Sequence, residues 1–292
     1  MSESNVRKGA EIPVGISLSA GAFSGVLARF FVAPIDVVKI RMQLQTDATK
    51  YETITKAVTS IIRDEGLGAF WKGNVPAELM YLVYGASQFA LYSAMNTYTS
   101  RVEDRYKLNI PGPIHSLIIG SVSGCLGTCV SYPFDLLRTR LVYNEKPQFA
   151  SLFGEVSQII RHTGFSGFFG GGVLSVTSVA LSSGISFACY TFLRDETKGT
   201  RFEGASGLLA GAISKTVIYP LDLLKRRRQV STTETSIKMS KAILASEGIK
   251  GFYHGIIPSV IKSAPTTMLS LYFYELATGW LMKRRESFAM EA

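Results

Sequence analysis

Cysteine, histidine and charged residues are all scarce in this sequence. Its 292 residues include three cysteines and three histidines, and 18% are charged. Cys125, Cys129 and Cys189 lie in apolar stretches without further cysteine or histidine ligands beside them. They are therefore expected to pack as small apolar residues, and not to form a disulfide or a metal site. No spacing places a base beside a nucleophile, so we expect neither an enzyme nor a bound metal or cofactor.

Apolar residues are abundant instead. They make up 47% of the chain, and the mean hydropathy of +0.20 is higher than that of an ordinary soluble enzyme. The sequence therefore predicts a membrane protein. Residues 1–12 are polar and contain no apolar core, so they do not predict a signal peptide. The net charge of +9 leaves two interpretations open, basic loops against anionic lipid or an anionic cargo.

A proline followed by an acid and two bases occurs three times, each time at the end of a long apolar segment. The copies are Pro34-Ile-Asp36-Val-Val-Lys39-Ile-Arg41, Pro133-Phe-Asp135-Leu-Leu-Arg138-Thr-Arg140 and Pro220-Leu-Asp222-Leu-Leu-Lys225-Arg-Arg227. A second motif follows each copy: Glu65-Gly66 before Trp71-Lys72-Gly73, Thr163-Gly164 before Phe169-Gly170-Gly171, and Glu247-Gly248 before Tyr253-His254-Gly255. Two motifs repeated in phase indicate three repeats of one unit, at residues 12–101, 112–199 and 202–285.

Each repeat is expected to hold two membrane helices and one short surface helix, which makes an all-α protein with six transmembrane helices. The expected spans are about residues 14–43, 74–98, 113–141, 172–193, 205–229 and 256–282. Apolar residues at helical spacing predict surface helices at about residues 53–63, 152–161 and 236–246, which are too short to span. Charged segments at residues 100–107 and 194–203 are expected to separate the repeats as hinges.

With its two triplicated motifs, nearly the whole chain resembles the mitochondrial carrier family. The resemblance implies six helices around a threefold pseudo-axis and alternating access to a central site. It also implies the mitochondrial inner membrane, with both termini on the intermembrane-space side. Within the family, residues 73–89, 131–140 and 262–267 resemble the thiamine pyrophosphate carriers. These shorter similarities are less specific than the triplicated motifs.

The acids and bases of the proline motif are expected to form a gate on the matrix side. An acid and a base three residues apart share one helix face, so each acid can pair with a base of another repeat. The expected pairs are Asp36 with Arg138, Asp135 with Lys225, and Asp222 with Lys39. Gln43 and Gln229 resemble the glutamine braces of the family, while the second repeat has Val142 there. Static ion pairs at helix ends, or contacts with lipid headgroups, are the alternative interpretation.

The opposite, cytosolic gate is expected to be weaker. The family resemblance assigns it to polar positions on the even-numbered spans: Ser93, Asn96, Thr191, Arg194, Glu275 and Thr278. Of these six residues only Arg194 and Glu275 can form an ion pair. We therefore expect the empty carrier to rest readily with that side open.

Helical spacing from the motifs predicts the cargo site. Arg29, Thr128 and Lys215 each precede their proline by five residues, and the family's contact positions on the even spans are Met80, Ser178 with Val179, and Lys262. Three cations at mid-membrane depth without matching acids favour a polyanionic cargo, because a charge there costs at least about 2.5 kcal/mol. The alternative for each cation is a structural ion pair or snorkelling to the interface.

Met80, Tyr84 and Gln88 recur on one face of the second span and can hold a flat heteroaromatic ring. Cations and an aromatic wall together describe thiamine pyrophosphate, taken up in exchange for nucleotides. Coenzyme A, a deoxynucleotide or an ADP/ATP-like cargo remains the alternative. We expect a monomer that binds anionic lipid such as cardiolipin and no nucleic acid. A receptor or scaffold that uses the same fold is disfavoured because all three gate motifs are intact.

Overall fold

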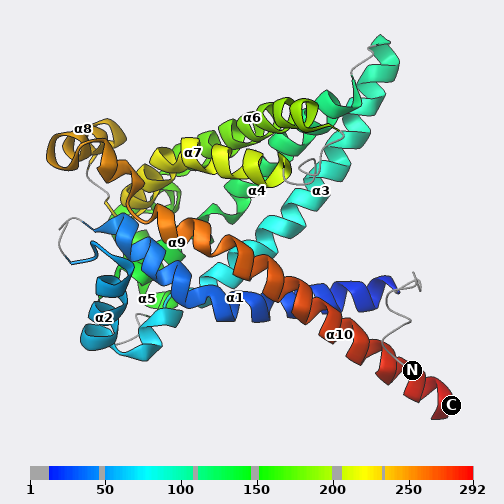
Figure 1. Ribbon diagram of the computed structural model, residues 1–292, viewed down its shortest axis with the longest axis horizontal. Helices are drawn as coiled ribbons and strands as arrows, with labels where there is room; N and C mark the ends of the chain where they lie inside the picture. The colour runs from blue at the N-terminus through cyan, green and yellow to red at the C-terminus, as the bar shows by residue number, and fades with distance from the viewer. Residues whose placement is uncertain are drawn as a thin grey trace. The chain divides into compact units, whose positions relative to one another are not determined.

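The computed structural model describes residues 13–45, 50–107, 111–145, 151–198, 206–231 and 234–291, and within them it contains helices and turns but no strand (Figure 1). The long helices are α1 (Val14–Leu44), α3 (Asn74–Tyr106), α4 (Gly112–Tyr143), α6 (Gly172–Thr197), α7 (Ser206–Val230) and α10 (Ser263–Glu291). The short ones are α2 (Ile54–Glu65), α5 (Leu152–Thr163), α8 (Ser236–Glu247) and α9 (Ile256–Ile261). The all-α prediction is confirmed. The polar segment 1–12 lies outside the described residues.

The predicted spans agree with the observed helices except in three places. One is α6, which continues to Thr197 and so includes the first residues of the predicted hinge at 194–203. The sixth span is interrupted at Lys262, between α9 and α10. Pro265 explains the break, since proline lacks an N–H and its ring clashes with the carbonyl group four residues earlier. The predicted hinge at residues 100–107 is wrong, because α3 continues to Tyr106. It ends at Lys107, whose left-handed backbone lets its N–H bond the carbonyl of Glu103.

Four segments are long and apolar enough to cross a membrane: Gly15–Leu44, Gly112–Tyr143, Phe165–Thr197 and Ser206–Val230. The other two long helices, α3 and α10, have 33 and 29 residues, more than the roughly 20 that a crossing needs, but they are less apolar. Large apolar side chains such as Leu18, Phe89 and Leu208 are exposed on these helices, as a lipid-facing surface requires.

Each predicted repeat places a short helix against the end of its proline-containing helix. Buried side chains join α1 to α2, α4 to α5 and α7 to α8 in three separate apolar clusters. A single 3₁₀ turn follows each short helix: η2 (Leu67–Trp71), η3 (Phe165–Phe169) and η5 (Ile249–Tyr253). These turns were not predicted, although the glycines that bound them were part of the second motif.

The second glycine of that motif starts the next helix with a positive φ at Gly73, Gly171 and Gly255. At Gly73 the need for glycine is also steric, because an added Cβ would lie 2.9 Å from the carbonyl oxygen of Arg138. The motif therefore specifies a tight turn that brings one repeat's chain against the helix of the next repeat.

The chain divides into two compact units, residues 1–36 with 257–292, and residues 37–256. In the first, the rings of Phe31 and Phe273 stack at 5.6 Å between α1 and α10. In the second, α3 packs along α4, and α6 packs along both α7 and α4.

Candidate functional site

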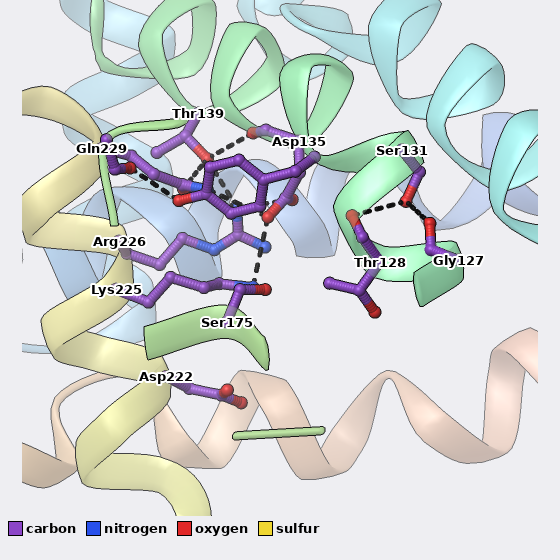
Figure 2. Close-up of polar contacts among 12 residues, drawn as sticks. Gly127, Thr128, Ser131, Asp135, Thr139, Ser175, Asp222, Lys225, Arg226 and Gln229 are labelled. Carbon is purple, nitrogen blue, oxygen red and sulfur yellow. Dashed lines mark hydrogen bonds and ion pairs between the residues drawn. The ribbon is translucent and has the colours of Figure 1, made fainter. Parts of the chain in front are cut away.

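The most connected polar site lies where α4 faces the end of α7. We call it the Asp135 cluster: Asp135 and Thr139 of α4 with Lys225, Arg226 and Gln229 of α7. Figure 2 shows the three α7 side chains reaching toward the two α4 residues. The predicted pair is present, with Lys225 Nζ 3.2 Å from Asp135 Oδ2. Gln229 Nε2 donates to the same oxygen at 3.0 Å, the position expected of a brace.

Arg226 belongs to this cluster and was not predicted. Its guanidinium donates to Asp135 Oδ1 at 2.8 Å, to the hydroxyl of Thr139, and to Gln229 Oε1 at 3.1 Å. Its signal in the sequence was the uninterrupted run of four bases from Lys225 to Arg228. The buried carboxylate of Asp135 thus faces two cations, which offsets the cost of removing it from water.

The equivalent acid of the third repeat is held differently. Asp222 pairs with Lys215, two helical turns earlier on α7 itself. Its predicted partner Lys39 contributes to the positive field around the carboxylate, as does Lys225. The nearest partner of Asp222 is therefore not the one predicted. A separation of seven residues puts Lys215 on the face of Asp222, within reach of a lysine side chain.

In the first repeat, Asp36 pairs with Lys262 at 2.6 Å. The expectation that Lys215 and Lys262 lack matching acids is therefore wrong. A cation at this depth is costly without a counter-charge, and the gate acids are the carboxylates that the helical spacing brings within reach. The predicted pair of Asp36 with Arg138 joins residues of the two separately described units and stays a prediction.

Three predicted cargo residues meet at Gly124 of α4. A Cβ added to Gly124 would lie 3.5 Å from Val179 Cγ1, 3.7 Å from the Tyr84 hydroxyl and 4.0 Å from Gln88 Nε2. The side chains come from α3 and α6, so the predicted aromatic wall converges with the predicted α6 contact. Ser178, next to Val179, is buried, and its hydroxyl has no hydrogen-bond partner among the described residues.

The structure also describes other predicted cargo and brace residues. The hydroxyl of Thr128 donates to the carbonyl of Gly124 itself at 2.7 Å. Met80 is partly buried on α3, and Arg29 packs its guanidinium over Gly25 on α1. Gln43 is fully buried, and its amide donates to the hydroxyl of Tyr219 at 3.1 Å and not to a gate acid.

The predicted cytosolic-gate residues form no ion pair with one another within residues 37–256. Asn96 Oδ1 lies 3.1 Å from His115 Nε2, and His115 Nδ1 lies 2.6 Å from Glu103. The hydroxyl of Thr191 donates to its own helix, while Ser93 and Arg194 are exposed. In the other unit, Thr278 is buried and Glu275 is exposed. The pair of Arg194 with Glu275 spans both units and stays a prediction.

Further ion pairs lie near the C-terminal ends of α1, α4 and α7, the three helices that contain the motif prolines. Arg41 lies 2.8 Å from Glu65, which Lys72 also contacts, and Arg227 lies 3.7 Å from Glu247. The second repeat has Thr163 in place of this acid, and there Arg140 lies 3.6 Å from Glu155 instead.

Two tyrosines that directly precede a motif proline were also missed. The hydroxyl of Tyr132 donates to the carbonyl of Gly170 at 2.6 Å, and that of Tyr219 donates to the carbonyl of His254 at 2.8 Å. Their signal was the dipeptide Tyr-Pro in the second and third copies of the motif. These bonds tie each helix to the glycine turn of its own repeat.

Outside the membrane segments, Glu145 accepts hydrogen bonds from Lys50 at 2.6 Å and from Tyr51 at 2.8 Å. Partial burial raises the pKa of Glu145, but these bonds outweigh it and hold the pKa below its ordinary value. With Arg41 and Arg140 these residues line a cleft of about 810 Å³. None of the predicted cargo residues lines it.

Comparison with known proteins gives the family of the chain. The sequence pattern of the family described as "Mitochondrial carrier protein" matches residues 10–103, 111–201 and 202–285. The chain is 40% identical to mitochondrial thiamine pyrophosphate carrier 1 of Scheffersomyces stipitis, over 96% of each chain. Identity is 38% to the protein of the same name from Candida albicans, over 97% of each chain, and 34% to that of Saccharomyces cerevisiae, over 96% and 98%.

Proposed function

Because the chain belongs to the mitochondrial carrier protein family, we propose that it carries thiamine pyrophosphate across the inner mitochondrial membrane by alternating access. As a member of that family it is a transporter of a mitochondrial membrane and not an enzyme. The relatives named above are thiamine pyrophosphate carriers, and the similarity to this chain extends over nearly their whole length. The cargo of this chain is inferred from those names together with its own charged residues.

The observation that carries the proposal is the pairing of two predicted cargo lysines with two gate acids. Lys262 holds Asp36 at 2.6 Å, and Lys215 holds Asp222. A diphosphate carries more negative charge than a carboxylate, so it competes with each acid for its lysine. Binding of the cargo would release Asp36 and Asp222 from these lysines. The two acids could then form different ion pairs in the proposed matrix-side gate.

The organic part of the cargo has a complementary surface. Tyr84, Gln88 and Val179 meet at Gly124, and Gly124 has no side chain that would fill the space between them. A flat pyrimidine ring can lie against the tyrosine while the glutamine amide bonds its polar edge. The buried, unpartnered hydroxyl of Ser178 offers one more donor near Val179.

Transport into liposomes tests the cargo. Protein reconstituted with internal nucleotide is expected to take up thiamine pyrophosphate with saturation. Thiamine monophosphate should compete less well because it has lost one phosphate group, and free thiamine should hardly compete. If coenzyme A or ATP competes better than thiamine pyrophosphate at equal concentration, the proposed cargo is wrong and the alternative cargo class is favoured.

Lys262 gives a sharper test within the same assay. Lys262→Ala should weaken competition by the diphosphate at least tenfold more than competition by the unphosphorylated vitamin, because the substitution removes a charge from a low-dielectric site. Thr267→Ala, at an exposed position near the start of α10, is the matched control. Equal losses for both ligands would exclude Lys262 from the phosphate site.

The remaining features of the proposal follow from the family. We propose that the carrier is a monomer with both termini on the intermembrane-space side, that its counter-substrate is a nucleotide, and that it binds no nucleic acid. We also propose that it binds an anionic lipid such as cardiolipin, to which its net charge of +9 is suited. Uptake by protein reconstituted with and without cardiolipin tests the lipid requirement.

A further inference from the structure

Large apolar residues are exposed at the same two positions of every repeat. The residue directly after the first glycine of the second motif is Leu67, Phe165 or Ile249, and these three are 67%, 76% and 73% exposed. Four residues before the same glycine the chain has Ile62, Ile160 and Leu244, which are exposed as well. Single exposed apolar residues are common on protein surfaces, but two positions that recur in three repeats call for a common partner.

The apolar clusters of the protein do not account for these residues, because other side chains serve that purpose. Directly before each exposed Ile or Leu of the short helices is a buried isoleucine of the cluster: Ile61, Ile159 or Ile243. In the 3₁₀ turns of the first two repeats, Phe70 and Phe168 are the buried members. Each short helix with its turn therefore has a second apolar surface that faces away from the protein. We call it the apolar anchor of the repeat: Ile62 with Leu67, Ile160 with Phe165, and Leu244 with Ile249.

The anchors lie on an ordered corner of the chain. The N–H of Gly66 donates to the carbonyl of Ile62 at 3.1 Å, and the N–H of Gly164 donates to the carbonyl of Ile160 at 3.1 Å. The next residue begins the 3₁₀ turn in each case. The two residues of an anchor thus flank the turn between the short helix and the 3₁₀ helix.

The opposite side of each short helix is polar. Two residues before the motif glycine the chain has Asp64, His162 and Ser246, and all three are exposed. A separation of two residues turns them about 160° away from the first anchor residue. The exposed surface of each short helix is therefore apolar on one side and polar on the other.

Exposed cations accompany the anchors. Arg63 and Arg161 directly follow the first anchor residue of their repeats, and Lys250 directly follows the second anchor residue of the third repeat. Arg63 lies 3.0 Å from Asp64, and its side chain remains exposed. A segment with apolar side chains on one side, and with arginine or lysine beside them, is typical of a membrane interface, where the cation can reach a lipid phosphate.

We propose that the three anchors insert into the lipid leaflet nearest the motif prolines, with acyl chains as their partner. A bilayer presents the same surface to every repeat, whereas a second copy of this chain in a closed dimer would cover one patch. Continuity also favours lipid. Val75 and Val173, the second residues of α3 and α6, are exposed, so the apolar surface continues along the chain from the anchors into two long helices.

Insertion of an anchor would also hold a contact between repeats. Six residues after Leu67, Gly73 packs closely against the carbonyl oxygen of Arg138 in the second repeat. Lipid that holds the turn therefore fixes the depth of this contact in the membrane. The inference does not depend on which cargo the protein carries.

Fluorescence quenching in bilayers tests the insertion without any cargo. With Trp71 and Trp280 replaced by phenylalanine, Phe165→Trp leaves one tryptophan, at the second anchor. In liposomes of phosphatidylcholine brominated near the top of its acyl chains, the fluorescence should fall by about half, because an interfacial segment lies about 5–10 Å deep. His162→Trp in the same background is the matched control, since His162 is exposed on the polar side of α5, and it should be quenched much less. Equal quenching of the two tryptophans, strong or weak, would overturn the proposal, and weak quenching of both is the result expected if a protein covers the anchor.

A triple variant extends the test to all three repeats. Leu67→Gln, Phe165→Gln and Ile249→Gln together change exposed side chains, so the variant should melt near the wild-type temperature in detergent. Added phospholipid should raise the melting temperature of wild type roughly twice as much as that of the variant, because the anchors no longer bury apolar area in lipid. The matched control combines Asp64→Asn, His162→Gln and Ser246→Asn and should respond as wild type does. An equal response of all three proteins would overturn the proposal, and the comparison of single tryptophans decides it if the triple variant does not fold.

Discussion

Asp135 and Asp222 occupy the same position of the same motif, yet the structure satisfies them in different ways. Asp135 draws its cations, Lys225 and Arg226, from a neighbouring helix. Asp222 draws Lys215 from its own helix. A bond between helices must break before the helices can separate, whereas a bond within one helix does not resist their separation. The motif therefore specifies which charges are present, but not whether they form an ion pair between two helices or within one helix.

The difference follows from what surrounds each acid. α7 presents two cations and Gln229 to Asp135, and Thr139 completes the network from α4. Near Asp222, Lys215 competes for the carboxylate against Lys39 and Lys225. If Lys215 binds cargo as proposed, its pairing with Asp222 in the empty protein leaves the contact between α7 and other helices weaker at this position. A cargo that removes Lys215 would free Asp222 for a partner on another helix.

The largest expected effect on stability comes from removing the charge of Asp135, the acid that is paired between two helices. Asp135→Asn leaves Lys225 and Arg226 together without a counter-charge, which should cost about 3–5 kcal/mol of unfolding free energy. Asp222→Asn should cost only about 1 kcal/mol, because the Lys215 side chain is 42% exposed and can turn toward water. Thermal unfolding in detergent measures both. If both variants lose the same unfolding free energy, the ion pairs of Asp135 and Asp222 contribute equally to stability, and the comparison fails.

The next effect separates the two cations of the Asp135 cluster. Arg226→Gln removes bonds to Asp135, Thr139 and Gln229, so we expect a loss of about 2–3 kcal/mol. Lys225→Gln removes the contact with Asp135 at 3.2 Å and a long hydrogen bond to Ser175 at 3.4 Å, and should cost about 1 kcal/mol. Combining each with Asp135→Asn in a double-mutant cycle gives the coupling energies. A larger coupling for Lys225 than for Arg226 would contradict the assignment.

The contrast between Lys225 and Arg226 also shows what the sequence could predict. Repeats, helices and the pair of Asp135 with Lys225 followed from periodicity and motif spacing, because helical geometry fixes which residues share a face. Arg226 was missed because an extra base in a run of four carries no periodic signal. The partners of Lys215 and Lys262 were missed for another reason. Helical spacing shows that an acid lies within reach of each lysine, but not which of two neighbouring cations pairs with that acid.

A smaller effect on stability, but a specific one on transport, is expected from Lys215→Gln. The substitution frees Asp222 to pair with another helix and removes one phosphate contact. The unfolding free energy should change by less than about 1 kcal/mol, because Lys215 is partly exposed and a partly exposed pair within one helix contributes little. The KM for thiamine pyrophosphate should rise about tenfold, the value of one charge-assisted contact. An unchanged KM in liposome uptake would remove Lys215 from the cargo site and leave it as a structural partner of Asp222.

The smallest effect tests whether the comparison depends on the membrane environment. Glu145 also bridges two repeats, but it lies outside the membrane segments and its side chain is 46% exposed. Glu145→Gln should therefore cost no more than about 0.5–1 kcal/mol at pH 7, and less at high salt, which screens exposed pairs. Since the pKa of Glu145 in the folded protein lies below its ordinary value, its stabilisation is present above about pH 4.3 and disappears as the pH falls further. Wild type and variant should thus differ in melting temperature at pH 7 and converge below pH 4. If Glu145→Gln destabilises the protein as much as Asp135→Asn, burial does not explain why the ion pairs of Asp135 contribute strongly to stability. In that case any charged bridge between repeats would have the same weight.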